Sequence, residues 1–128
     1  MMKLTMILAS VVLSTLHVAA QTDDYKQALR LYEKGMLSRS EMIFANVAEH
    51  TRKAEPAGYS LLCDVRCKAP GYERRIDAYA ETYPYSVLLP QIRYQHALNL
   101  FDAGYYKDAA RVFAQLKEKV LYKSQRTE

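Results

Sequence analysis

The sequence predicts an all-α protein of three stacked antiparallel helix–turn–helix units, about six helices, preceded by a signal peptide. Apolar residues after Gln21 recur every three or four positions, which is the period of an amphipathic helix. No stretch alternates apolar and polar residues as a half-buried strand does. In addition, one long segment repeats itself 69 residues later, as expected of a repeat architecture.

The composition is that of one packed domain. The chain has 128 residues, of which 50% are apolar and 25% charged, a balance that excludes a disordered chain. Two cysteines are too few for a disulfide-dense scaffold or a four-cysteine zinc site. The net charge of +4 is spread among interleaved acids and bases, so no basic stripe predicts nucleic-acid binding. The eleven tyrosines are the unusual feature.

Residues 1–20 have the layout of a secretory signal peptide. Lys3 gives a basic start, residues 4–16 are mostly apolar, and Val18 and Ala20 are small residues before a cut at Gln21. A membrane anchor is the alternative, but it needs about 20 apolar residues. The stretch here is shorter and contains four hydroxyl side chains. We therefore expect an exported domain over residues 21–128, without a transmembrane segment.

Helix breakers divide this domain. Gly35 ends the first predicted helix, and Ser38 with Glu41 forms the pattern of a capping box at the start of the second. Pro56 suits the first turn of the third, because a proline lacks the N–H group that is unpaired there. The predicted helices span residues 23–34, 38–52, 56–68, 72–83, 90–104 and 107–122.

A self-comparison defines the repeat. Tyr25–Gly35 (YKQALRLYEKG) matches Tyr94–Gly104 (YQHALNLFDAG), and the match continues without a gap to Phe44 over Phe113. Tyr59 lies 34 residues after Tyr25 and 35 before Tyr94, which marks a middle unit that has diverged more. The three units cover residues 22–54, 55–86 and 88–122.

A helical hairpin of this period resembles the tetratricopeptide repeat. The link Tyr83-Pro84-x-Ser86 is similar to that of periplasmic members, the Tol–Pal coordinator and the β-barrel assembly lipoproteins. The middle unit departs from the pattern, with an arginine at the small-residue position and Pro70-Gly71 in its turn. The resemblance implies that the alanines and aromatic residues of the repeat pack between helices, and that Gly35 and Gly104 form the left-handed turns that end each first helix. The structural repeat positions are Ala28, Gly35, Ser40, Phe44, Tyr79, Ala97, Gly104, Tyr106, Ala109 and Phe113.

The sequence carries no catalytic motif. It lacks G-x-S-x-G, H-E-x-x-H and a Gly-rich phosphate loop, and His50 and His96 fall in different units. We expect no enzymatic activity, no cofactor and no bound metal.

Cys63 and Cys67 are four residues apart on one predicted helix, which places their Cα atoms about 6 Å apart. This separation allows a disulfide, although parallel Cβ directions would strain it. Three alternatives remain: two packed or half-exposed thiols, a disulfide in an oxidising compartment, or metal ligation without an evident third ligand.

The resemblance implies a concave face lined by the first helix of each unit. Tyrosine suits a protein-binding surface there, because it offers a large area at a low entropy cost and a polar tip. The alternative is that these rings pack between helices. By register, the lining positions are Tyr25, Leu29, Tyr32, Glu33, Tyr59, Cys63, Arg66, Cys67, Tyr94, Leu98, Phe101 and Asp102.

The expected function is a non-catalytic protein-binding scaffold of the cell envelope, in the periplasm or at the outer membrane. Its partners would be other envelope proteins or peptides, in outer-membrane assembly, division or secretion. The alternative is an architectural N-terminal segment of a longer repeat protein, because the last predicted helix remains apolar at Val112, Leu116 and Val120. A terminal repeat normally has a polar outer face. A small envelope hydrolase or thiol redox enzyme is the third alternative.

Overall fold

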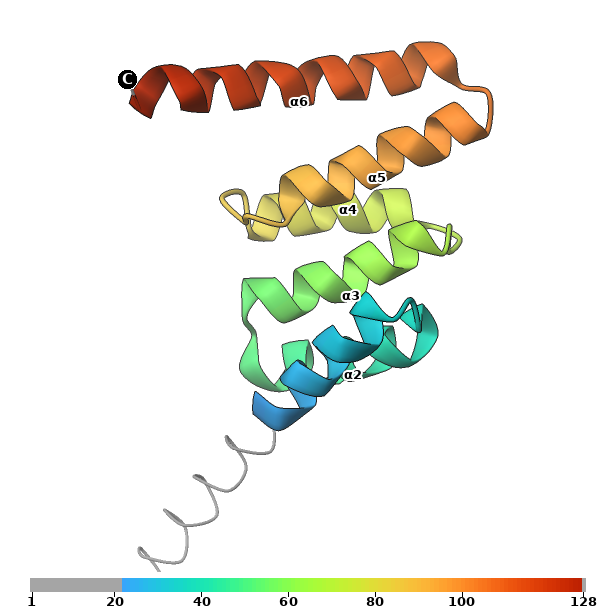
Figure 1. Cartoon of the computed structure of the whole chain (residues 1–128), viewed down its shortest axis with the longest axis vertical. Coiled ribbons are helices and arrows are strands. Elements are labelled where there is room, and N and C mark those ends of the chain that lie inside the picture. The colour runs from blue at the N-terminus through green and yellow to red at the C-terminus, as the bar shows by residue number, and fades with distance from the viewer. Residues whose placement is uncertain (1–21, 128) are drawn as a thin grey trace, which may run out of the picture.

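The computed structural model describes residues 22–127, with side chains described as far as Leu116 (Figure 1). Within these ranges the chain forms six helices and no strand, which confirms the predicted all-α class. The predicted signal peptide lies outside the described residues. The helices are a first one over residues 22–33, α2 (Leu37–Thr51), α3 (Ala54–Arg66), α4 (Tyr72–Thr82), α5 (Leu89–Asp102) and α6 (Tyr106–Thr127).

The helices form three hairpins that stack along one axis (Figure 1). Unit one is the helix over residues 22–33 with α2, unit two is α3 with α4, and unit three is α5 with α6. α3 lies at the centre of the stack, because it packs against α2, α4 and α5. Rings of Tyr25 and Tyr32 also join the first helix to Tyr59 of α3.

One turn geometry ends the first helix of units one and three. The N–H groups of Gly35 and Met36 donate to carbonyls three and five residues earlier, at 3.0 and 2.9 Å. Gly104 and Tyr105 do the same, at 3.0 and 2.9 Å. Both glycines have left-handed φ angles, 78° and 89°, as a Schellman turn requires. The backbone therefore repeats where the sequence does.

The middle unit makes this turn with a lysine. The N–H groups of Lys68 and Ala69 donate to the carbonyls of Val65 and Asp64, at 3.1 and 2.9 Å. Lys68 has a φ of 56°, although a side chain makes that region unfavourable. Gly71 then supplies a second left-handed residue directly before α4.

The predicted capping box is wrong. α2 begins at Leu37, so its N-cap is Met36 and no side chain caps it. Because the Gly35 turn leads directly into the helix, Ser38 lies inside the first turn, where it cannot act as the cap. The carboxylate of Glu41 instead accepts a hydrogen bond from the Ser60 hydroxyl at 3.1 Å, and this bond joins α2 to α3.

Small residues let the helices of unit one approach closely. Ala28, Phe44 and Cys63 form a fully buried cluster. Beside it, the buried Ser40 hydroxyl donates to the Ala28 carbonyl at 2.8 Å, and the Cys63 thiol donates to that hydroxyl at 3.9 Å. Ala97 and Ala109 are equally buried in unit three, so the alanines of the repeat are packing positions, as predicted.

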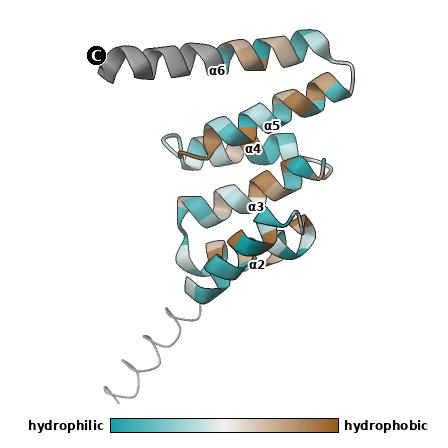
Figure 2. Ribbon diagram, in the orientation of Figure 1, coloured by the Kyte–Doolittle hydropathy of each residue, from teal (hydrophilic) through white to brown (hydrophobic). Residues whose placement is uncertain are grey.

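A second, larger core joins units two and three. Figure 2 shows its apolar residues interspersed with hydrophilic ones along α3 and α5, as expected of amphipathic helices. Tyr79 is buried in it, as predicted. The core consists of Leu61, Leu62, Val65, Tyr72, Ile76, Tyr79, Leu88, Leu89 and Ile92.

Tyr79 crosses α3 at a glycine. Its hydroxyl donates to the Ala54 carbonyl at 2.8 Å and is 2.6 Å from the Ser86 hydroxyl, so it joins α4, α3 and the loop before α5. A Cβ atom at Gly58 would lie 2.5 Å from the Tyr79 oxygen and 2.8 Å from Leu88. The absence of a side chain at Gly58 therefore allows this contact.

Candidate functional site

In units one and two, the tyrosines predicted to line the concave face form an aromatic cluster between helices. Tyr59 stacks on Phe44 with ring centres 5.0 Å apart and planes 15° apart. Tyr25 meets the edge of Phe44 at 5.7 Å, and Tyr32 meets Tyr59 at 5.5 Å. These three tyrosines are half-buried, so most of their ring area serves packing.

Burial also sets the acidity of two of these hydroxyls. It raises the pKa of Tyr25 to about 12, helped by the nearby Glu55 carboxylate, to which Tyr25 donates at 3.3 Å. Burial likewise raises the pKa of Tyr59, with smaller contributions from Tyr32 and Glu55. Both hydroxyls are therefore protonated donors at neutral pH.

In unit three the equivalent rings are exposed. Tyr94 is 53% exposed and Phe101 54% exposed. Tyr94 meets the edge of Phe113 at 5.7 Å, and Phe101 meets that of Tyr106 at 5.1 Å. Leu98 is half-buried, as is Leu29 in unit one, while Glu33 and Asp102 are exposed.

A groove of about 530 Å³ runs between α3 and α5. It contains three predicted lining residues, Tyr32, Arg66 and Tyr94. Sequence reasoning missed the others, although Gln91 lies one helical turn before Tyr94 and that register could have identified it. The residues that line this groove are Tyr32, Leu62, Arg66, Pro90, Gln91, Tyr94, Gln95 and Leu116.

The groove has apolar walls and a few polar groups. The Arg66 guanidinium lies 5.0 Å from the centre of the Tyr32 ring, within the range of a cation–π contact. Arg66 is exposed, so its N–H groups are accessible to a carboxylate. Gln91 and Gln95 add amide donors and acceptors along α5.

A buried polar network fixes the walls of the groove. The Asn99 amide donates to the Val65 carbonyl at 2.7 Å and to the Tyr72 hydroxyl at 3.3 Å. The Tyr72 hydroxyl also forms a hydrogen bond with Nδ1 of His96 at 2.7 Å. Gln95 in turn donates to Asn99 at 3.1 Å. The network joins α3, α4 and α5 and gives His96 a structural role.

The two cysteines are free thiols in different environments. Cys63 is 1% exposed, and burial raises its pKa to about 11. Cys67 is exposed at the end of α3. The expectation that Cys63 lines the concave face is wrong, because its side chain lies in the core with Ala28 and Phe44.

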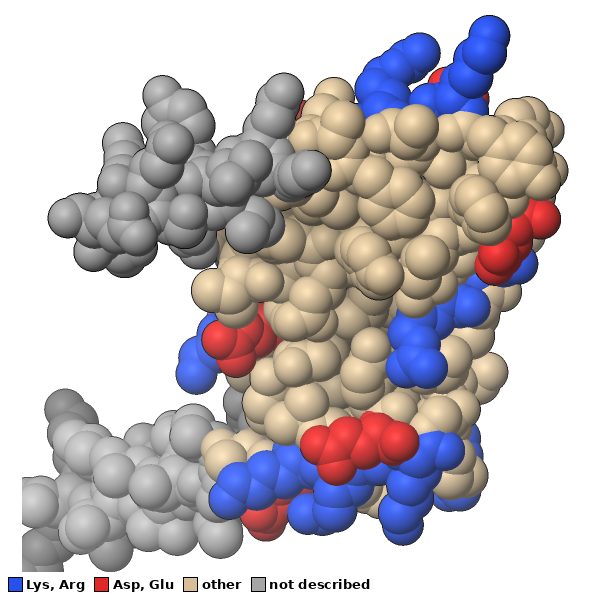
Figure 3. Space-filling view, turned by 45° about the horizontal axis from the view of Figure 1, so that its top comes forward, with Lys and Arg blue, Asp and Glu red and all other residues tan. Residues whose placement is uncertain are grey.

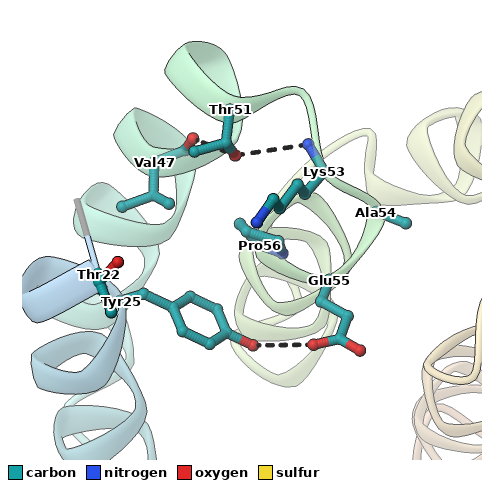
Figure 4. Close-up of a pocket in the computed structure, with 8 residues that line it drawn as sticks. All are labelled: Thr22, Tyr25, Val47, Thr51, Lys53, Ala54, Glu55 and Pro56. Carbon is teal, nitrogen blue, oxygen red and sulfur yellow. Dashed lines mark hydrogen bonds between the residues drawn. The ribbon is translucent and has the colours of Figure 1, made fainter. Parts of the chain in front are cut away.

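A second hollow, of about 620 Å³, lies where α2 ends and α3 begins (Figure 4). Figure 4 shows the Tyr25 hydroxyl and the Glu55 carboxylate facing each other across it, with Lys53 and Thr51 at the far side. Its opposite charges and hydroxyls form no recognisable catalytic arrangement. The lining residues are Thr22, Tyr25, Val47, Thr51, Lys53, Ala54, Glu55 and Pro56.

Within the described part of the chain, no three His, Cys, Asp or Glu side chains gather as a metal site would require. None of the described helices is both long and apolar enough to cross a membrane.

Comparisons with protein-family models, with curated proteins and with solved structures gave no match to this chain.

Proposed function

We propose that this protein is a non-catalytic scaffold that holds a peptide, or an extended segment of a partner protein, in the groove between α3 and α5. One observation carries the proposal: aromatic walls from Tyr32 and Tyr94 stand beside the accessible guanidinium of Arg66. Apolar walls with a few placed polar groups are the usual composition of a ligand site.

The lining residues indicate the chemistry of the ligand. Tyr94, Pro90 and Leu116 offer apolar area for one aliphatic or aromatic side chain. Arg66 offers paired N–H donors, which favour a carboxylate, either acidic or C-terminal. Gln91 can exchange hydrogen bonds with an extended backbone. The favoured ligand is therefore a peptide with a carboxylate close to an apolar residue.

The location we propose is the cell envelope. It rests on the signal-peptide layout of residues 1–20 and on the resemblance of the repeats to periplasmic tetratricopeptide proteins. The partners would then be envelope proteins or peptides, including those of outer-membrane complexes.

A selection from a displayed library of random twelve-residue peptides tests the proposal. We expect enriched peptides that contain an acidic and an apolar residue. Their binding, measured by fluorescence anisotropy, should weaken at least tenfold in Tyr94→Ala and in Arg66→Ala, because each removes a contact specific to the groove. Tyr85→Ala is the matched control, since this tyrosine is 96% exposed and lies outside the groove.

Two outcomes would contradict the proposal. One is a selection that enriches no peptide. The other is enriched peptides whose affinity is unchanged in both groove variants while circular dichroism shows that these variants are folded.

A further inference from the structure

Units one and three differ in exposure at the side on which unit one meets unit two. Phe44 is fully buried and Val47 nearly so, whereas their equivalents Phe113 and Leu116 are half-buried. Tyr32 is likewise half-buried, and its equivalent Phe101 is exposed. The alanines inside the hairpins, in contrast, are equally buried in both units. Rings that are covered in unit one, on the side where it meets α3, are therefore uncovered in unit three.

In unit one, α3 covers this side. Tyr59 of α3 stacks on Phe44 and contacts the rings of Tyr25 and Tyr32. Four residues later, Cys63 enters the buried cluster with Phe44. Three residues further, Arg66 lies over the ring of Tyr32. α3 thus contributes an aromatic residue, a small apolar residue and an arginine, all on one helical face.

Unit three presents the same receptor surface. Tyr94, Phe101 and Phe113 occupy the positions of the three rings that contact Tyr59, and Leu116 that of Val47. We call these four residues the unit-three face. Figure 3 shows mostly uncharged atoms over the α5–α6 hairpin, with charged side chains at its borders.

We propose that the unit-three face binds an amphipathic helix with the residue pattern of α3, presented by a further helical hairpin of the same type. An aromatic residue of that helix would stack on Phe113. An arginine seven residues later would lie over Phe101, as Arg66 lies over Tyr32. The internal copy of this interface, between unit one and α3, is what identifies the occupant.

The two faces also differ in a way that restricts the occupant. In unit one, Ser60 of α3 donates to Glu41, and Cys63 donates to Ser40. The equivalent positions in unit three are Ala110 and Ala109, which offer no side-chain acceptor. The docked helix should therefore carry an apolar residue where α3 has Ser60.

A helix-stabilised peptide with the sequence of residues 53–68, carrying Ser60→Ala, is the probe. Its binding to the full chain would be measured by fluorescence anisotropy. We expect saturable binding that Phe101→Ala and Phe113→Ala in the chain each weaken at least tenfold. Tyr59→Ala in the peptide should have the same effect, and Tyr85→Ala in the chain should have none. Because Phe101 is 54% exposed, Phe101→Ala should leave the core intact. This variant therefore tests the inference even if Phe113→Ala unfolds α6.

Three results would overturn the inference: no binding of the peptide, binding that is unchanged in Phe101→Ala, or a dimer in sedimentation that Phe101→Ala dissociates. The third would mean that a second copy covers the face. Arg66→Ala in the full chain distinguishes this inference from the proposed function of the groove. It should weaken the binding of the library-selected peptides and leave the binding of the α3 peptide unchanged. Loss of binding of one class of peptide therefore leaves the other testable.

Discussion

Single residues decide how closely the helices of this protein approach. Gly58 admits the Tyr79 side chain against α3, and the Tyr79 hydroxyl then joins three segments of the chain. Tyr79 is recognisable as a packing position from the repeat. Gly58 is not, because a glycine inside a predicted helix does not reveal which side chain will cross it.

Replacement of Gly58 by alanine should destabilise the protein. Alanine favours a helix over glycine by about 1 kcal/mol. Overpacking of a buried site costs about 1–3 kcal/mol, and here the new Cβ would meet two side chains below 3 Å. Because the helix preference offsets part of the overpacking cost, we expect Gly58→Ala to lower the free energy of unfolding by up to about 2 kcal/mol in urea titrations.

Tyr79→Phe provides the control, because it removes the nearest atom, the oxygen 2.5 Å from the new Cβ. Gly58→Ala should cost at least about 0.5 kcal/mol less in that background than alone. A Gly58→Ala variant more stable than the parent protein would show that the contact is not this tight.

The two thiols should react at different rates. Burial and a pKa of about 11 keep Cys63 neutral and inaccessible, whereas Cys67 is exposed. Iodoacetamide at pH 8 should therefore modify one thiol in the folded protein and both in urea, as measured by mass spectrometry. Two thiols modified in the folded state would contradict the burial of Cys63, and an unreactive chain lighter by two hydrogens would indicate a disulfide.

At the scale of elements, the sequence predicted the helix ends that are marked by a residue with a strong turn preference. Gly35 and Gly104 were recognisable, because a left-handed residue after a helix favours glycine. The turn at Lys68 was not, since its left-handed residue is a lysine, which has no preference for that region. The capping-box pattern failed because the N-cap is Met36, two residues before Ser38, so Ser38 and Glu41 lack the capping geometry.

Lys68→Gly should stabilise the middle turn. Glycine takes the left-handed region without the steric cost that a side chain adds. The relief of this steric cost exceeds the extra conformational entropy that glycine loses on folding. We expect a gain of about 0.5–1 kcal/mol in the free energy of unfolding.

Lys68→Ala is the matched control and should give no gain, because alanine keeps the steric cost. The ion pair lost in both variants, between Lys68 and Asp102 at 4.0 Å, is exposed and contributes little. Equal free energies of unfolding for the glycine and alanine variants would show that the left-handed backbone at residue 68 does not destabilise the protein.

At the scale of the whole molecule, the site depends on which unit has a neighbour. Register alone predicted Tyr32, Arg66 and Tyr94 in the groove. It could not distinguish Tyr25 from its equivalent Tyr94, because both occupy the same helical position and differ only in whether a third helix lies over them. Leu116 was missed because α6 reaches the groove through tertiary packing.

The stack also accounts for the tyrosines at the repeated positions. In units one and two they join neighbouring helices, while in unit three the equivalent rings form the wall of the groove and the unit-three face. One repeated pattern thus supplies both the cohesion of the array and its candidate binding surfaces.

The most direct test of the groove is a nuclear magnetic resonance titration of the isotope-labelled protein with a library-selected peptide. The account predicts saturable shifts of the amide and side-chain signals of Arg66, Gln91, Tyr94 and Gln95, while the signals of Lys53 and Glu55 at the second hollow stay unchanged. Shifts centred on Lys53 and Glu55, without change at Arg66 and Gln91, would contradict it.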